Sequence, residues 1–186
     1  MDNRKRCEWV EVGNEAYYRY HDEEWGQPLY DDHELFELLC METYQAGLSW
    51  QLVINKRDAF HRAFHDYEVT KVAAMTSDDV ELLMDDASII RNRMKLQATI
   101  TNAQAFLAIQ QEYGSFAKFF WSFVADNPID HKITVMGDIP TKNDLSESVA
   151  KAFKKKGFKF LGPVSMYSYL QGAGLINDHE LSCEWH

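Results

Sequence analysis

The residues most informative about the fold are Lys154-Lys155-Lys156-Gly157-Phe158-Lys159-Phe160-Leu161-Gly162-Pro163-Val164-Ser165. Their pattern predicts a helix that ends at Gly157, a short hairpin bounded by glycines, and a new helix that begins near Pro163. The first amides of a helix have no partner within it and lie at the positive end of its dipole, so they can hold an anion. These residues therefore predict a helix, a hairpin and a second helix, with a binding site for one anion at the start of the second helix.

Basic charge is concentrated around this hairpin, although the chain as a whole is acidic. The 186 residues include 19 Lys and Arg against 29 Asp and Glu, which gives a net charge of −10. That balance disfavours a protein that coats nucleic acid through many phosphate contacts, but it permits an enzyme that holds one phosphate. The alternative is a helix end followed by a solvated run of lysines. The candidate phosphate-binding residues are Gly157, Lys159, Gly162, Val164 and Ser165.

Apolar residues recur at helical spacing along almost the whole chain, so we predict an all-α fold. The segment from Ile129 to Ile139 is polar and is expected to be a loop. The expected helices are Asp32–Gly47 capped by Asp32, Trp50–Phe64, Val69–Met75, Val80–Met84 after a cap at Ser77-Asp78-Asp79, Asn92–Tyr113 stopped by Gly114, Phe116–Val124, one capped by Asp144 or Ser146 that runs to Lys156, and one that begins near Pro163.

Length and composition indicate one compact unit or two closely packed lobes. The lobes would be a helical one of about residues 30–145 and another of residues 1–29 and 146–186. Apolar residues at 46% and charged residues at 26% exclude a disordered chain. No apolar run approaches the roughly 20 residues of a membrane span, and no apolar segment follows the first residues. We therefore expect a cytoplasmic protein without membrane contact.

Metal-ligand residues stand near both ends of the chain. Cys7 and His21 are fourteen positions apart, and His179 and Cys183 are four apart. Together they would form a tetrahedral Cys2His2 zinc site, and a closed site of four protein ligands is structural rather than catalytic. Such a site would tie both termini, which otherwise tend to fray. The alternative for His21 is a loop histidine with ordinary hydrogen-bond partners.

One carboxylate, Glu42, falls on the apolar stripe of its predicted helix, in register with Leu38 and Leu39. Burial of a carboxylate costs several kcal/mol unless it is paired or lines a cavity. We expect Glu42 to point into a pocket whose walls come from Tyr44, Gln45 and Trp50. The alternative is a helix-end glutamate that turns to solvent or bonds to nearby backbone.

Aromatic residues are dense near the start of the chain. Core packing explains any one of them, but a purine needs a flat apolar slot with a few polar groups at its edge. Indole, phenol and carboxylate groups together supply such a slot. The aromatic residues concerned are Trp9, Tyr17, Tyr18, Tyr20, Trp25 and Trp50.

Five ordered motifs carry a family resemblance that extends from about Cys7 to Cys183. They are Cys7-Glu8-Trp9, Tyr20-His21-Asp22-Glu23-Glu24-Trp25-Gly26, Gln45-Ala46-Gly47-Leu48-Ser49-Trp50, Lys156-Gly157-Phe158-Lys159-Phe160-Leu161-Gly162 and Asn177-Asp178-His179. In this order they resemble the 3-methyladenine DNA glycosylase I family, bacterial base-excision-repair enzymes of the helix-hairpin-helix superfamily.

The resemblance implies a helix-hairpin-helix fold with one structural zinc bound by Cys7, His21, His179 and Cys183. Its implied activity is monofunctional hydrolysis of the N-glycosidic bond of 3-methyladenine in alkylated double-stranded DNA, by a monomer, with free base released and an abasic site left. Glu42 matches the recognition carboxylate and is the expected catalytic residue. The implied base-binding residues are Tyr17, Tyr20, Trp50, Ser168, Trp25 and Trp9.

The chain departs from the family pattern in small ways. Ser88 stands where the family often has glycine, Leu161 and Pro163 are local variants of the hairpin, and Pro163 removes one amide. Asp178 occupies a place comparable to a catalytic aspartate of related glycosylases. Because it adjoins His179, it is as well placed to orient a zinc ligand, so we leave it out of the catalytic set.

Two other functions fit parts of the pattern. One is a damage-binding module with the same pocket but without hydrolysis. The other is a small zinc hydrolase in which Cys7, His21 and His179 hold a catalytic metal and a water completes it. Release of free base separates the first from a glycosylase. Loss of activity on chelation without loss of fold would favour the second.

Overall fold

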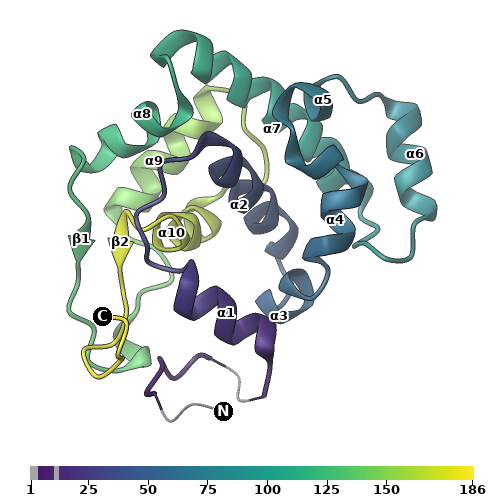
Figure 1. Cartoon of the computed structure of the whole chain (residues 1–186). Coiled ribbons are helices and arrows are strands. Elements are labelled where there is room, and N and C mark those ends of the chain that lie inside the picture. Colours follow the sequence, from purple (N-terminus) through teal and green to yellow (C-terminus); the bar gives the residue numbers. More distant parts are fainter. Residues whose placement is uncertain (1–3, 11–12) are drawn as a thin grey trace.

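The computed structural model describes residues 4–10 and 13–186 (Figure 1). The fold is mostly helical, which confirms the predicted class in its coarse form. The elements in chain order are α1 (Glu15–Glu23), α2 (Asp32–Gln45), α3 (Trp50–Ile54), α4 (Arg57–Ala63), η1 (His65–Tyr67), α5 (Val69–Ala73), α6 (Ser77–Asp85), α7 (Arg93–Tyr113), α8 (Phe116–Trp121), η2 (Ser122–Val124), β1 (Ile129–Asp130), η3 (Met136–Asp138), α9 (Asp144–Lys155), α10 (Pro163–Gly172) and β2 (Ile176–Asn177).

Helices α2 and α10 lie side by side in the middle of the molecule (Figure 1). Helix α2 also packs on α7 and α8, and α10 packs on α9, so both central helices are buried on most of their faces. A helix that is apolar nearly all round is typical of a core position. This packing places the carboxyl half of α2, which carries Glu42, against the face of α10.

Three helix caps differ from the prediction. Thr76 caps α6 in place of Ser77-Asp78-Asp79, because its side chain accepts from the N–H of Asp79, and the helix begins at Ser77. Asp31, not Asp32, caps α2, because its side chain accepts hydrogen bonds from the backbone N–H groups of His33 and Glu34. Asp32 instead reaches across to α8 and accepts from the N–H groups of Phe116 and Ala117, each at 2.8 Å. Asn143 caps α9 in place of Asp144 or Ser146. Adjacent carboxylates and amides compete for a cap, and tertiary contacts decide between them.

The predicted helix Trp50–Phe64 is wrong in one respect, because it is two helices. The chain leaves helical geometry at Lys56, which has φ −106° and ψ 4°, and Asn55 ends α3. Asparagine competes for backbone hydrogen bonds and so favours helix ends over interiors. Helix α1 was not among the predicted helices. Its N-cap is Asn14, whose side chain accepts from the N–H of Tyr17.

The segment from Ile129 to Ile139 is not entirely loop. Its first two residues form β1, which pairs in parallel with β2 in the register Ile129 with Ile176 and Asp130 with Asn177. Figure 1 shows the two short strands beside each other at one edge of the molecule. Two-residue strands carry no period-two signal, so the pairing depends on tertiary contact rather than on local pattern.

The hairpin between α9 and α10 follows the predicted order. Gly157 ends α9 with a left-handed φ of +97°, which glycine tolerates. The side chain of Phe158 is buried, while Lys159 and Gly162 are exposed. Asn102, which is fully buried on α7, accepts from the N–H of Lys159 at 2.8 Å and donates to its carbonyl at 3.1 Å. The hairpin is therefore held by a buried side chain distant in sequence.

The carboxyl-terminal segment returns to the amino-terminal one, and the N–H of Glu184 donates to the carbonyl of Lys5 at 2.9 Å. Among the described helices, none combines the length and the apolar character that crossing a membrane requires.

Candidate functional site

A cavity of about 460 Å³ opens between α1, the α2–α3 turn, α10 and the segment before α9. Glu42 and the six predicted base-binding residues all contribute to its wall. The lining residues are Trp9, Tyr17, Tyr20, Trp25, Glu42, Gln45, Trp50, Met136, Ile139, Pro140, Thr141, Val164, Tyr167, Ser168 and Gln171. Residues from both ends of the chain thus meet around one space with six aromatic residues in its wall, which is the geometry of a small-molecule site.

Glu42 is buried in this wall, with 2% of its surface exposed. Its Oε2 atom has no hydrogen-bond partner among the described residues. Burial raises the pKa of the Glu42 carboxyl from 4.5 to about 8. The alternative of a glutamate turned to solvent is therefore wrong. A carboxyl with this pKa holds its proton through much of the neutral range, so Glu42 is not a standing negative charge in the cavity wall.

Two indole N–H groups accompany the unpartnered carboxyl oxygen. The Nε1 atoms of Trp9 and Trp50 are buried and lack acceptors among the described residues. The Oη of Tyr67, outside the cavity, is the only other such side-chain atom in the described part of the chain. Buried polar groups are paired in most proteins, so three unpaired ones in a single wall point to a missing ligand.

The aromatic rings of the wall pack against one another, one pair edge to face and another tilted. The rings of Trp9 and Trp25 lie 4.9 Å apart at 73°, and those of Tyr20 and Trp50 lie 4.9 Å apart at 50°. Burial, and after it the charge of Glu42, raises the pKa of the Tyr20 phenol, so it stays a neutral donor. Gly172 on α10 makes room for that phenol, since an added Cβ would lie 2.9 Å from the Tyr20 hydroxyl.

One predicted wall residue is misplaced. Tyr44 does not line the cavity but stacks on Phe60 with ring centroids 4.0 Å apart. The reason is helical geometry, since Tyr44 lies two positions from Glu42 and so faces another side of α2. Lys95 on α7 holds this end of α2, because its ammonium donates to the carbonyls of Tyr44 and Ala46.

Part of the wall was not foreseen from the sequence. Val164, Ser168 and Gln171 follow at spacings of four and three along α10, so one helical face carries all three. Ser168 is among the predicted base-binding residues. The same helical spacing, extended by three positions, would have predicted Gln171 as a wall residue. The residues of the segment before α9 (Met136, Ile139, Pro140 and Thr141) carried no comparable signal, because the segment has no helical period.

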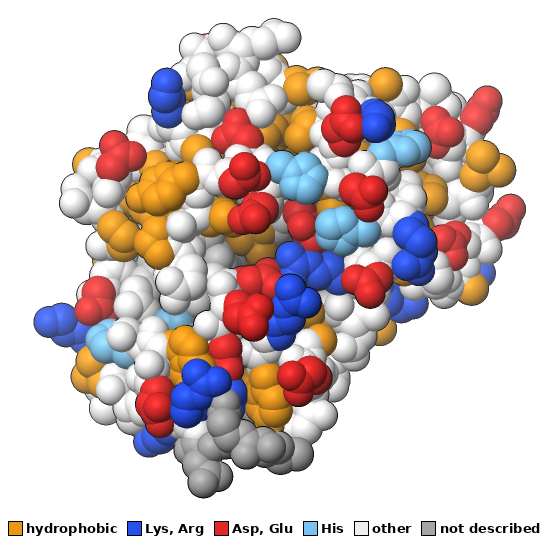
Figure 2. All heavy atoms as spheres, viewed as in Figure 1, with side chains coloured by type: hydrophobic (Ala, Val, Ile, Leu, Met, Phe, Trp, Pro, Cys, Tyr) orange, Lys and Arg blue, Asp and Glu red, His pale blue; other side chains and the backbone are white. Residues whose placement is uncertain are grey.

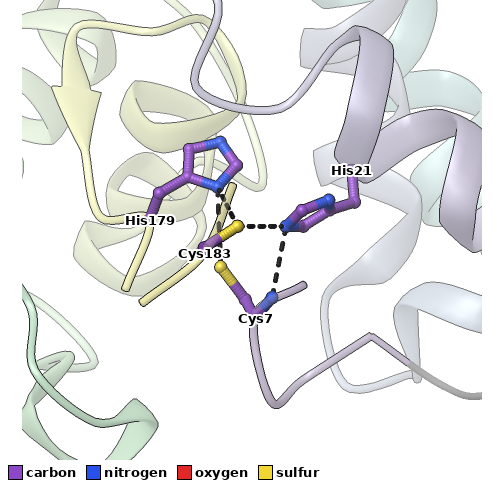
Figure 3. A group of neighbouring side chains, drawn as sticks. All are labelled: Cys7, His21, His179 and Cys183. Atoms are coloured by element: carbon purple, nitrogen blue, oxygen red, sulfur yellow. Dashed lines mark hydrogen bonds between the residues drawn. The ribbon is translucent and has the colours of Figure 1, made fainter. Parts of the chain in front are cut away.

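The four predicted metal ligands lie together, and all are buried (Figure 3). Cys183 Sγ is 3.4 Å from His21 Nε2 and 3.5 Å from His179 Nδ1, and Cys7 Sγ is 3.5 Å from the same Nδ1. All four ligand atoms lie within 4.8 Å of one another. Zinc bonds of about 2.3 Å to sulfur and about 2.0 Å to nitrogen give tetrahedral S–N edges of roughly 3.5 Å. The donor set and its spacing therefore fit zinc.

The two imidazole rings of this cluster are oriented by hydrogen-bond partners that are not themselves predicted metal ligands. Asp22 Oδ1 lies 2.8 Å from His21 Nδ1, and the carbonyl of Trp25 lies 3.0 Å from His179 Nε2. Burial lowers the pKa of His21, and it lowers that of His179 to about 4, so both rings are held neutral as metal ligands require. Gly26 is needed here, because an added Cβ would lie 2.9 Å from the His179 ring.

Asp178 does not orient the neighbouring predicted metal ligand, His179. The second ring nitrogen of His179 faces the carbonyl of Trp25, whereas Asp178 binds His131, Tyr167 and Gln171. The suggested role beside His179 is therefore wrong.

The predicted phosphate seat adjoins the cavity. No side chain caps the start of α10, where Pro163 occupies the first turn and Val164 reaches the cavity wall. Of the nearby lysines, Lys156 is engaged with Glu112 at 2.6 and 2.8 Å. On the face in Figure 2, basic side chains are interspersed with acidic ones rather than gathered in a continuous field. The arrangement suits one local phosphate contact rather than a coated surface.

Comparison with known proteins agrees with this geometry. A model of the methyladenine glycosylase family matches residues 9–186. DNA-3-methyladenine glycosylase 1 of Escherichia coli (strain K12) is 46% identical over 179 residues, which are 96% of this chain and 95% of that protein. A crystal structure of 3-methyladenine DNA glycosylase I matches with a TM-score of 0.95 at 46% identity, over 98% of this chain and 100% of the other.

A second solved structure, a variant of 3-methyladenine DNA glycosylase I in complex with 3-methyladenine, matches with a TM-score of 0.91 at 43% identity, over 94% of each chain. The resemblance indicated by the five sequence motifs is confirmed, and the chain belongs to the methyladenine glycosylase family.

Proposed function

We propose that this protein hydrolyses the N-glycosidic bond of 3-methyladenine in alkylated double-stranded DNA, releases the free base and leaves an abasic site. The observation that carries the proposal is the unpartnered Oε2 of Glu42, buried in an aromatic cavity beside two unpartnered indole N–H groups. A flipped purine supplies what these atoms lack, since its edge carries both donors and acceptors and its faces stack on aromatic rings.

Methylation at N3 gives the adenine ring a positive charge, which weakens its bond to deoxyribose. Glu42 would accept a hydrogen bond from the exocyclic amine and offset that charge. Since the pKa of Glu42 is about 8 in the free cavity, the cationic base takes the place of the carboxyl proton at neutral pH. A neutral adenine offers no such exchange, so the desolvation of Glu42 selects against it.

Stacking on Trp50 adds a cation–π attraction of about 0.5–2 kcal/mol for the charged ring. A methylated base also unstacks from DNA at lower cost than a sound one. No lysine lines the described cavity, so a covalent Schiff-base step is not expected and the strand stays intact. The protein thus needs to hold the base and admit water to the sugar carbon.

DNA binding would use the helix-hairpin-helix between α9 and α10. The free amides of Val164 and Ser165 at the start of α10, with Gly157, Gly162 and the side chain of Lys159 nearby, would hold one backbone phosphate. The cavity receives wall residues both from about residues 30–145 and from the two end segments. This supports an active site between two packed lobes of one monomer.

One structural zinc would be bound by Cys7, His21, His179 and Cys183, for which the donor set and the 3.4–3.5 Å contacts are suited. When bound, the metal supplies cross-linking of the two ends of the chain rather than Lewis-acid chemistry, because four protein ligands leave no open position. This disfavours the small zinc hydrolase. Bound zinc would affect the base cavity through α1, because this helix carries both His21 and the wall residues Tyr17 and Tyr20.

The test is a single-turnover reaction of the zinc-loaded protein, in excess, with methylated duplex DNA. Chromatography should find free 3-methyladenine in the soluble fraction and an equal number of abasic sites in unbroken strands. Tight binding of the methylated DNA without release of base would instead identify a damage-binding module. Strand breaks formed with the abasic sites would contradict the hydrolytic mechanism.

A further inference from the structure

A fully buried carboxylate lies directly behind the cavity wall. Asp178 has no exposed surface and follows β2. Its Oδ2 accepts hydrogen bonds from Tyr167 Oη at 2.5 Å and from Gln171 Nε2 at 2.7 Å, and its Oδ1 lies 2.7 Å from His131 Nδ1. Asp178 does not line the cavity, but Tyr167 and Gln171 do.

These contacts fix the orientation of the Gln171 amide. A carboxylate accepts hydrogen bonds and cannot donate, so only the NH₂ end of Gln171 can face Asp178. The carbonyl oxygen Oε1 is then the end of the amide that remains available to a ligand. No donor among the described residues bonds to it, although Gln171 is only 8% exposed and belongs to the cavity wall. Gln171 Oε1 is therefore a fixed neutral acceptor without a partner among the described residues, on a residue of the cavity wall.

We propose that Gln171 is a specificity-determining residue whose Oε1 is a second acceptor, with Glu42, for the exocyclic amine of a methylated purine. Asp178 is then a positioning residue that prevents the Gln171 amide from turning over. The inference rests on the proposed function and deepens it. A purine with oxygen at position 6 would place an acceptor against Oε1, and two facing acceptors repel. A site built around a substrate N–H rejects an analogue that lacks it more strongly than a site built on shape alone.

The same carboxylate also ties together two walls of the cavity. His131 follows β1, and its N–H donates to the carbonyl of Asn177 at 3.3 Å, so the β1–β2 pairing brings it to Asp178. The segment that continues from His131 supplies Met136 and Ile139 to the wall, while α10 supplies Gln171. Asp178 therefore fixes the position of Gln171 Oε1 relative to the wall residues Met136 and Ile139.

The experiment uses duplex DNA methylated with dimethyl sulfate, which contains both 3-methyladenine and the 6-oxo base 3-methylguanine. The release of both bases in one single-turnover reaction is measured by chromatography for wild type, Gln171→Met and Asp178→Asn. Because both bases compete for the same active molecules, their ratio does not depend on the fraction of protein that is folded. Gln104→Met is the matched control, since the Gln104 amide also donates to one oxygen, at 3.1 Å, but the residue is exposed on α7 and does not line the cavity.

Gln171→Met is expected to lower the ratio of 3-methyladenine to 3-methylguanine release by about tenfold or more, the value of one hydrogen bond with a charged partner. Asp178→Asn should move the ratio in the same direction, and Gln104→Met should leave it at the wild-type value. An unchanged ratio in Gln171→Met overturns the proposal. A changed ratio in Gln171→Met with an unchanged one in Asp178→Asn retains Gln171 and removes the positioning role of Asp178.

A binding measurement separates failure of this inference from failure of the proposed function. Free 3-methyladenine and free 3-methylhypoxanthine, its 6-oxo analogue, are titrated against the tryptophan fluorescence of the same variants. If wild type releases no base, the proposed function fails, yet selective loss of 3-methyladenine affinity in Gln171→Met still supports the acceptor role. Equal loss for both bases, or binding of neither by wild type, contradicts it.

Discussion

Glu42 combines two properties that seldom occur together in a carboxyl group, full burial and an oxygen without a partner. An orphaned acceptor of this kind lowers the stability of the folded protein and is retained when a ligand completes it. The pKa of about 8 has a related origin, because burial of the carboxyl favours its neutral form. Glu42 is thus prepared to exchange a proton for a cationic base.

The buried carboxyl predicts a pH-dependent cost of stability that Glu42→Gln removes. The folded-state pKa is about 8 against 4.5 in water, so the folded state binds more protons than the unfolded state between these values. Wild type should therefore lose stability relative to Glu42→Gln as pH rises from about 4.5 to 8, by about 1.4 kcal/mol per pH unit at most. Urea unfolding of both proteins at several pH values measures the difference. A difference that stays constant with pH would contradict the raised pKa.

Sequence reasoning located Glu42 because a carboxylate on an apolar helical stripe is conspicuous. It could not find the environment of Asp178. That aspartate meets His131 from 47 positions away and only through a two-residue strand pair, which leaves no periodic trace. The misplaced Tyr44 shows the converse limit, since nearness in sequence to a site residue does not place a side chain on the same face.

At the scale of elements, most helices were predicted because their periods and caps are strong, as for α7 with Asn92 before it and Gly114 after it. The predictions were wrong where the local sequence allows more than one structure and tertiary contacts determine which one forms. Asp32 resembles a cap of its own helix but serves α8, while Asp31 caps α2. The break at Lys56 and the short strand β1 depend likewise on neighbours distant in sequence.

Exchanging the two aspartates for alanine tests this division of roles. Asp31→Ala removes one ordinary cap and should cost about 1 kcal/mol. Asp32→Ala removes an acceptor for three donors, Gln110 Nε2 and the N–H groups of Phe116 and Ala117, and should cost about 2–3 kcal/mol. Chemical denaturation of the pair gives both values. Equal costs, or a larger cost for Asp31→Ala, would contradict the cross-helix cap.

The hairpin depends on Asn102, which bonds to both backbone groups of Lys159. Asn102→Ala should release the hairpin and weaken the binding of methylated duplex DNA by about tenfold, the value of the lost hydrogen bonds. Affinity for free 3-methyladenine should change little, because Asn102 does not line the cavity. Fluorescence anisotropy with DNA and titration with free base separate the two effects.

Gln104→Ala on the same helix is the control for this variant and should retain DNA affinity. If Asn102→Ala loses base and DNA affinity to the same degree, the substitution acts on the whole fold rather than on the hairpin.

At the scale of the whole molecule, the ends of the chain close the structure. The cluster of Cys7, His21, His179 and Cys183 joins the amino-terminal segment, α1 and the segment after β2 (Figure 3). Residues of α1 and of α10 both line the cavity, so the arrangement of the termini bears directly on the site. The dispersed ligands were predictable because two of three cysteines stand near the ends with histidine partners. The distances between the ligand atoms could not be predicted from the sequence.

Metal removal tests the structural role of the cluster. The purified protein should contain one zinc per chain by elemental analysis. Chelation should lower the melting temperature by at least 10 °C, because binding free energy at a structural site is folding free energy. Activity should disappear together with the fold. Activity lost with the melting temperature unchanged would instead favour a catalytic metal.

The Glu42 carboxyl, buried among indoles, is the group proposed to recognise the charged base. The decisive measurement is the single-turnover rate of 3-methyladenine release from methylated duplex DNA, compared between wild type and Glu42→Gln at pH 7.5. Loss of a carboxylate facing a cation in a buried site should slow release by about 10²-fold or more while duplex binding stays near the wild-type value. Release by Glu42→Gln at the wild-type rate would contradict the account.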